Sequence, residues 1–336
     1  ILATKAFSMF STFPLIGKYL KGVTSSSLHE ARLGYEKMGK EVHIYAPAYR
    51  EDEFDDIMKY SDHIIFSSFS QWKKFRDKVK NNQGKKIECA IRINPEYSEI
   101  ETDIYNPCFE NSRMGVTLDN FEEDELEGID GLHFHTMCEQ NSDTLERTIK
   151  VVDEKFGKYI KKMKWINFGG GHHITRVDYD VDRLIEVLKA FKTRYPHLTV
   201  YLEPGEAVGW QTGPLVSRVL DIIHNGMDIA VLDTSAEAHM PDTLAMPYRA
   251  AVRGAGESGE KKYTYRLGGN TCLSGDIIGD YSFDEPLKIG DRIVFEDQCH
   301  YTFVKNTTFN GINLPSLAVL RLNGKMEVVK NFGYED

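Results

Sequence analysis

Short runs of apolar and β-branched residues alternate with amphipathic stretches through the first 205 residues of the chain. Eight runs have the length and composition of buried strands: residues 1–5, 22–26, 42–46, 63–67, 88–94, 131–135, 165–169 and 199–203. Between them, apolar residues recur at the helical period over residues 28–39, 70–80, 142–163 and 180–195. Strands that alternate with helices predict parallel βα units, and eight such units predict an α/β fold, a closed (β/α)8 barrel of the TIM type.

The pattern changes after Gly205, where the helical period nearly disappears. Strand-like runs separated by Gly, Asp and Asn then cover residues 214–223, 228–235, 263–269, 291–297, 317–324 and 326–332. Such a succession is typical of an all-β domain. We therefore expect a barrel over residues 1–205 and a C-terminal β-sandwich or open β-barrel over residues 206–336.

Polar residues gather where the predicted barrel strands end. Strands also end in polar residues for purely structural reasons, but in a (β/α)8 barrel the carboxyl ends of the strands form the active site. The residues concerned are Lys5, Ser25, Ser67, Arg92, Asn94, His135, Gly169 and Glu203. Their concentration at one edge favours a functional site.

Composition narrows the class of protein. The chain has 336 residues, 41% of them hydrophobic and 27% charged, and no apolar run is long enough to cross a membrane. The net charge is −10 and the basic residues are scattered, which argues against nucleic acid and anionic membranes as partners and suits a cationic ligand. The five cysteines include no CxxC pair, so a cytoplasmic protein without a disulfide framework is expected. The chain opens inside a strand-like run without Met, so we expect residues upstream.

Three strand ends carry chemistry that can be argued from the residues. Gly169, Gly170 and Gly171 let backbone N–H groups approach an anion such as phosphate, although a tight turn needs the same residues. Lys5, if desolvated in a barrel mouth, becomes an amine nucleophile, although most lysines are surface residues. Glu203 could keep a pyridine nitrogen protonated or belong to an ion pair at the barrel rim.

Other candidates lie outside this set. His133 and His135 share one face of a strand, which allows a metal site, a ring stacked on an aromatic cofactor, or ordinary core packing. Cys272 lies in the run GNTCLSGD and could act as proton donor or nucleophile. The remaining candidates are acids for a cationic substrate, Glu206, Asp242 and Asp276, and a hydroxyl for phosphate, Tyr301.

In order along the chain, these pieces resemble the pyridoxal-phosphate decarboxylases of the alanine racemase-like fold, which include ornithine and diaminopimelate decarboxylases. The motifs are a lysine ending the first strand, a histidine strand, GGG, EPG, GNTCLSGD and the run from Tyr301 to FNG. Within that family, four segments of this chain are similar to those of the decarboxylases of carboxynorspermidine and carboxyspermidine. They are LEPGEAVGWQTG, INFGGGHHIT, SAEAHMPDT and KNTTFNGI. The resemblance covers essentially the whole chain.

The resemblance implies a pyridoxal 5′-phosphate cofactor and a homodimer with shared active sites. Lys5 matches the lysine that attaches the cofactor, His135 the histidine stacked on its ring, and Glu203 the acid at its pyridine nitrogen. The three glycines and Tyr301 match phosphate ligands. Cys272 matches a cysteine supplied to the neighbouring subunit's site, with Cys272 or Lys5 as the proton donor.

Two departures bear on the substrate. Relatives that act on amino acids usually read EPGR, where this chain has Glu206, and often HxGS, where it has His135-Thr136-Met137-Cys138. An acid in place of the arginine suits a polyamine-like substrate, so decarboxylation to norspermidine or spermidine is expected, with Glu206, Asp242 and Asp276 as substrate contacts. The alternatives are a diaminopimelate or ornithine decarboxylase, a non-catalytic cofactor-binding member of the fold, and a metal hydrolase that uses His133 and His135.

Overall fold

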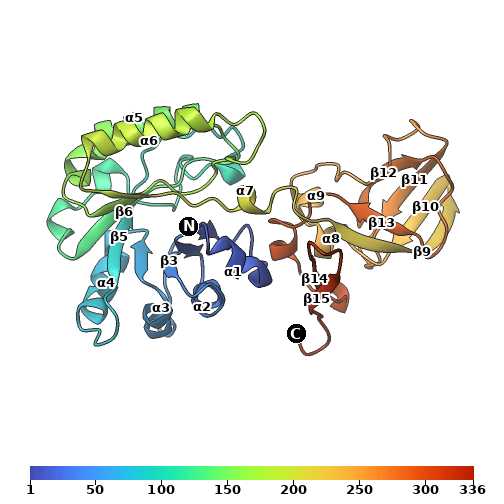
Figure 1. Ribbon diagram of the computed structural model, residues 1–336, viewed down its shortest axis with the longest axis horizontal. Helices are drawn as coiled ribbons and strands as arrows, with labels where there is room; N and C mark the ends of the chain where they lie inside the picture. Colours follow the sequence, from blue (N-terminus) through green and yellow to red (C-terminus); the bar gives the residue numbers. More distant parts are fainter. The chain divides into compact units, whose positions relative to one another are not determined.

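The computed structural model describes all residues from Ile1 to Asp336 (Figure 1). The chain forms two compact units. The first contains Ile1–Lys5 and Thr12–Val208, and the second contains Ala6–Ser11 and Gly209–Asp336. The chain thus leaves the first unit directly after Lys5 and returns to it at Thr12.

The first unit is the predicted parallel barrel. Its eight strands are hydrogen-bonded in chain order, and every neighbouring pair is parallel. They are β1 (Leu2–Ala3), β2 (Gly22–Ser25), β3 (Glu41–Tyr45), β4 (His63–Phe66), β5 (Glu88–Arg92), β6 (Ile129–His133), β7 (Trp165–Asn167) and β8 (Thr199–Tyr201). Two backbone bonds join the last strand to the first, from Ile1 N to Leu202 O (2.9 Å) and from Ala3 N to Pro204 O (3.0 Å). The sheet is therefore closed.

The four predicted helices are confirmed as α2 (Leu28–Lys37), α4 (Phe69–Lys80), α5 (Ser142–Ile160) and α6 (Val181–Arg194). Side chains of Ser27, Ser68 and Asp180 cap the first turns of α2, α4 and α6. A further helix, α3 (Phe54–Tyr60), was not predicted. Its seven residues bury only Phe54, Ile57 and Met58, which is too short a pattern to establish a helical period. The short helices α1 (Phe13–Ile16) and α7 (Glu206–Gly209) complete this part of the chain.

The barrel interior contains bulky apolar residues, and one glycine there makes room for the largest of them. Ile1, Ile65, Ala90, Trp165 and Tyr201 form a buried cluster. Gly131 pairs with Trp165 across β6 and β7, and a Cβ on Gly131 would lie 2.3 Å from the indole. Only glycine leaves room for the Trp165 ring at this place.

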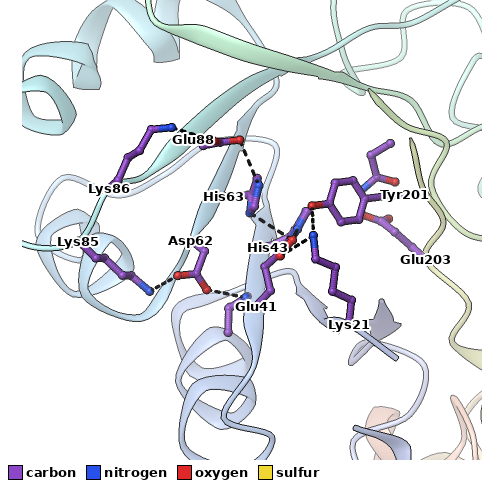
Figure 2. Close-up of polar contacts among 12 residues, drawn as sticks. Lys21, Glu41, His43, Asp62, His63, Lys85, Lys86, Glu88, Tyr201 and Glu203 are labelled. Carbon is purple, nitrogen blue, oxygen red and sulfur yellow. Dashed lines mark hydrogen bonds and ion pairs between the residues drawn. The ribbon is translucent and has the colours of Figure 1, made fainter. Parts of the chain in front are cut away.

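A polar cluster lies at the amino-terminal ends of the barrel strands (Figure 2). Glu41 Oε1 is 2.7 Å from His43 Nε2 and 3.7 Å from His63 Nδ1, and Glu41 Oε2 is 3.0 Å from Lys21 Nζ. The buried rings of His43 and His63 stack with their centroids 3.9 Å apart. Burial lowers the pKa of both histidines, that of His63 to about 4. This cluster is at the opposite end of the barrel from the predicted site.

The second unit is built on sheets, as predicted for the C-terminal part. Five strands lie in the order β12-β11-β10-β9-β13, and only the β10–β11 pair is parallel. They are β9 (Leu215–Asn225), β10 (Met227–Leu232), β11 (Tyr263–Gly268), β12 (Ile277–Phe283) and β13 (Arg292–Phe295), and β14 (Leu317–Leu320) and β15 (Met326–Lys330) form a separate hairpin. The unit also has two short helices, α8 (Ala236–His239) and α9 (Asp242–Ala245). The strand β12 was not predicted, because the glycines around Cys272 suggested one long loop.

No helix is both long enough and apolar enough to span a membrane. All five cysteines are free thiols.

Candidate active site

Four of the predicted barrel residues lie just beyond the carboxyl ends of strands. Lys5 follows β1, His135 follows β6, Gly169 follows β7 and Glu203 follows β8. Because parallel strands end at the same edge of the sheet, these residues share one end of the barrel. Charge interactions link Lys5, His135 and Glu203, which shows that they occupy one electrostatic environment.

Glu203 is a buried carboxylate held by two side chains of the barrel. Asn167 Nδ2 donates to its Oε1 at 2.7 Å, and His133 Nε2 is 3.4 Å from its Oε2. Burial alone would raise the pKa of Glu203, but the interactions with His133 outweigh it and place the pKa well below the usual range. Glu203 is therefore ionised at neutral pH.

The side chain of Lys5 is exposed to solvent, yet its surroundings disfavour the charged ammonium relative to the neutral amine. Desolvation by the surrounding protein lowers the pKa of Lys5, Glu203 acts against this, and Arg92 lowers the pKa further. A lysine in such surroundings has a larger fraction of neutral amine than a surface lysine. This is the state in which lysine attacks a carbonyl group.

His135 is neutral and fixed by the glycine turn. The Gly170 N–H donates to His135 Nδ1 at 3.1 Å, so Nδ1 is the unprotonated nitrogen. Desolvation, with help from Lys5, holds the pKa of His135 well below its ordinary value. A neutral imidazole of fixed orientation is suited to stacking on an aromatic ring.

The glycine turn is required by its backbone geometry. Gly169 and Gly171 have φ values of 71° and 85°, and a Cβ on Gly170 would lie 2.5 Å from the Glu203 carbonyl oxygen. The Gly169 N–H donates to Asn167 Oδ1 at 2.8 Å, and the Gly170 N–H to His135. In this structure these two N–H groups bond within the barrel end, so either of them would have to exchange its present partner to contact a phosphate.

Glu206, the first residue of α7, belongs to a small cluster within the first unit. Ligand atoms of Glu206, Glu139 and His173 all lie within 4.8 Å of one another. Two carboxylates and an imidazole at this spacing form an anionic group that favours ammonium or a metal ion. His133 and His135, the pair considered for a metal hydrolase, point to different partners, Glu203 and the Gly170 N–H.

The second unit holds the other predicted residues, and two of its acids already have partners. Asp276 is buried and accepts from Ala236 N (2.7 Å) and from the hydroxyl of Thr271 (2.6 Å). It thereby fixes the loop on which the exposed Cys272 lies. Asp242 is ion-paired with Lys305 at 2.8 Å.

Tyr301 and Cys272 are both held through their backbones. Tyr301 has a φ of 31°, and its N–H donates to Ala6 O at 2.8 Å. The Cys272 N–H donates to Asn310 Oδ1 at 2.7 Å. Both residues therefore have defined positions within the second unit.

Sequence reasoning missed Asn167, which contacts both Glu203 and the glycine turn. It lies inside the run WINFG, which the apolar pattern assigns to a strand. The available signal was a single amide residue in an apolar strand, two positions before the first glycine. A buried amide of this kind needs hydrogen-bond partners, which the turn and a nearby carboxylate supply.

Comparison with known proteins places these features in a family. Residues 35–298 match the model for "Pyridoxal-dependent decarboxylase, C-terminal sheet domain". The chain is 49% identical to the carboxynorspermidine/carboxyspermidine decarboxylase of Campylobacter jejuni, covering 100% of this chain and 89% of that protein. It is 47% identical to the carboxyaminopropylagmatine decarboxylase of Synechocystis, covering 100% and 86% respectively.

A solved structure agrees with these relatives. The carboxynorspermidine decarboxylase of Campylobacter jejuni, complexed with norspermidine, superimposes with a TM-score of 0.91 at 48% identity. The match covers 100% of this chain and 90% of that one.

Proposed function

This chain belongs to the pyridoxal-dependent decarboxylases, and we propose that it decarboxylates carboxynorspermidine or carboxyspermidine to norspermidine or spermidine. The observation that carries this proposal is the 49% identity, over the full chain, with a relative named for both substrates. A second candidate substrate is carboxyaminopropylagmatine, favoured by the 47% identity with the relative named for it.

The residues of the barrel fit the cofactor. When bound, pyridoxal phosphate supplies an electron sink for the electron pair left by departing CO2. We propose that Lys5 attaches the cofactor through its readily deprotonated amine, and that His135 packs on the ring. The ionised Glu203 would hold a proton on the ring nitrogen, and we assign the cofactor to the barrel predicted over residues 1–205.

We place the cationic end of the substrate at Glu206 and its neighbour Glu139. Both carboxylates belong to the cluster completed by His173, whose negative charge suits a secondary or primary ammonium. Asp242 already pairs with Lys305, and Asp276 already accepts from Ala236 N and from the Thr271 hydroxyl, so part of the charge of each acid is already matched. For this reason we assign the amine contact to Glu206 first.

We further propose a cytoplasmic homodimer in which the Cys272 loop serves the partner subunit's site. The exposed thiol and the anchoring of this loop by Asp276 and Asn310 support that role, because a group offered to another chain must be both accessible and fixed. The phosphate would be held in part by Tyr301.

The test is CO2 release by the purified protein loaded with pyridoxal phosphate. The substrates are carboxynorspermidine, carboxyspermidine, carboxyaminopropylagmatine, diaminopimelate and ornithine. We expect release from the first two, with the faster one identifying the chain length preferred. Release from carboxyaminopropylagmatine alone would support the second candidate. Release from none, with cofactor bound, would overturn the proposal in favour of a non-catalytic member of the family.

A further inference from the structure

We propose that Asn167 is a positioning residue of this decarboxylase, which keeps Glu203 ionised, oriented and coupled to the glycine turn. The inference rests on the role proposed above for Glu203. Asn167 is the last residue of β7 and its side chain is fully buried. It touches none of the residues assigned to the substrate, so its influence on the reaction would pass through Glu203.

The amide of Asn167 has only one orientation that satisfies its neighbours. Its Oδ1 accepts the Gly169 N–H at 2.8 Å, and its Nδ2 donates to Glu203 Oε1 at 2.7 Å. Reversing the amide would set an N–H against an N–H and an oxygen against a carboxylate. The two bonds therefore define a donor facing Glu203, which an ionised carboxylate side chain could not supply.

A third bond closes a ring of contacts around this amide. The backbone N–H of Glu203 donates to Gly169 O at 2.8 Å. Asn167, Gly169 and Glu203 thus hold one another at three points, and the next residue, Gly170, holds His135. A single side chain couples the acid, the turn and, through the turn, the imidazole.

His133 provides the second contact to Glu203 without neutralising its charge. Its Nε2 is 3.4 Å from Glu203 Oε2, while its Nδ1 has no hydrogen-bond partner. Burial lowers the pKa of His133 and Glu203 opposes that shift, and the unpartnered Nδ1 leaves Nε2 as the nitrogen that directs a proton at the carboxylate. Asn167 and His133 thus each direct an N–H at Glu203, which keeps the carboxylate ionised toward the ring nitrogen of the bound cofactor.

The isosteric variant Asn167→Asp separates this role from simple packing. It keeps the acceptor for Gly169 but sets a second carboxylate against Glu203, and two carboxylates in contact cannot both be ionised near neutral pH. Asn82→Asp is the matched control. Asn82 Nδ2 donates to Lys85 O (3.0 Å) and its Oδ1 accepts from Gly84 N (3.2 Å), so no carboxylate receives its donor.

The measurements are cofactor affinity of the apoenzyme and the absorption of bound cofactor between pH 5 and 9. For Asn167→Asp we expect affinity to fall by about tenfold or more, the loss typical of a hydrogen bond to a charged group. We also expect a transition in that pH range that the wild type lacks, because the carboxylate pair retains a proton. The control variant should match the wild type in both measurements.

Two outcomes would overturn the inference. One is an Asn167→Asp variant that binds the cofactor with wild-type affinity and shows the wild-type pH profile of absorption. The other is a variant whose only change is a lowered melting temperature. If Asn167→Asp does not fold, Asn167→Ala removes the donor without adding charge and should weaken cofactor affinity in the same direction. Neither measurement uses substrate, so a failed substrate panel leaves this test intact, and unchanged spectra in an active enzyme overturn only the role of Asn167.

Discussion

At the scale of single residues, Lys5 and Glu203 show how one barrel end can favour a different protonation state in each of two ionisable groups. Desolvation lowers the pKa of Lys5, whereas polar contacts outweigh desolvation for Glu203. The same surroundings thus favour a neutral amine and an ionised acid. Both states are those that the proposed cofactor chemistry requires.

Replacing Lys5 with Ala should abolish covalent attachment of the cofactor and reduce turnover by several orders of magnitude. The reason is that the amine of Lys5 is the group proposed to form the covalent bond with the cofactor. The absorption spectrum after borohydride reduction and dialysis measures retained cofactor. Lys18→Ala, at an exposed lysine, is the control. Full retention of cofactor by the Lys5 variant would contradict the assignment.

Replacing Glu206 with Gln should raise KM for the carboxylated polyamine by about tenfold with little change in kcat. A charge-assisted bond to the distant amine contributes to ground state and transition state alike. Steady-state kinetics measure the split, and Glu285→Gln at an exposed acid is the control. A fall in kcat at constant KM would place Glu206 at the reacting atoms instead.

At the scale of elements, the barrel was predictable because apolar residues recur at a different spacing in its strands than in its helices. All eight barrel strands and the four long helices lie where the apolar pattern places them. The pattern did not find α3, whose apolar stripe is short, or β12, which follows a glycine-rich loop. The order of candidate residues at strand ends was also predictable. The bonds among them were not, because Asn167 and Gly170 find partners on other strands.

Gly131→Ala should destabilise the barrel by about 1–3 kcal/mol, the usual result of overpacking. The added methyl group would meet the Trp165 ring on the next strand, and both are buried by the strands around them. Urea unfolding followed by tryptophan fluorescence measures the change. Gly333→Ala, where a Cβ meets no atom within 4 Å, is the control. Equal stability of the two variants would show that the indole moves aside freely.

At the scale of the whole molecule, stability should fall as the pH is lowered from about 6.5 towards 4. The pKa of His63 is lowered to about 4 by burial and by His43, whereas an unfolded histidine titrates near 6.5. Within that window the unfolded chain binds the extra proton, so the folded state loses up to about 1.4 kcal/mol per pH unit. The carboxylates of Glu41, Asp62 and Glu88 oppose the shift only in part.

Urea unfolding at a series of pH values tests this expectation. The variant His63→Gln should show a smaller loss of unfolding free energy between pH 6.5 and 4 than the wild type. His224→Gln, at an exposed histidine, should follow the wild-type curve. Identical pH dependence in all three proteins would place the acid sensitivity elsewhere, for example in the buried His43.

The path of the chain near Lys5 has a consequence for inheritance. Residues Ala6–Ser11 belong to the second unit, although the rest of that unit begins at Gly209. A single recombination event after residue 208 would therefore give a protein in which residues 6–11 come from one parental gene. The rest of the second unit, from Gly209 on, would come from the other. Such a hybrid would combine Tyr301 with a foreign partner at Ala6. The chain passes between the units at residues 5/6, 11/12 and 208/209, so exchanging one whole unit needs three crossovers, and the two units are expected to descend together.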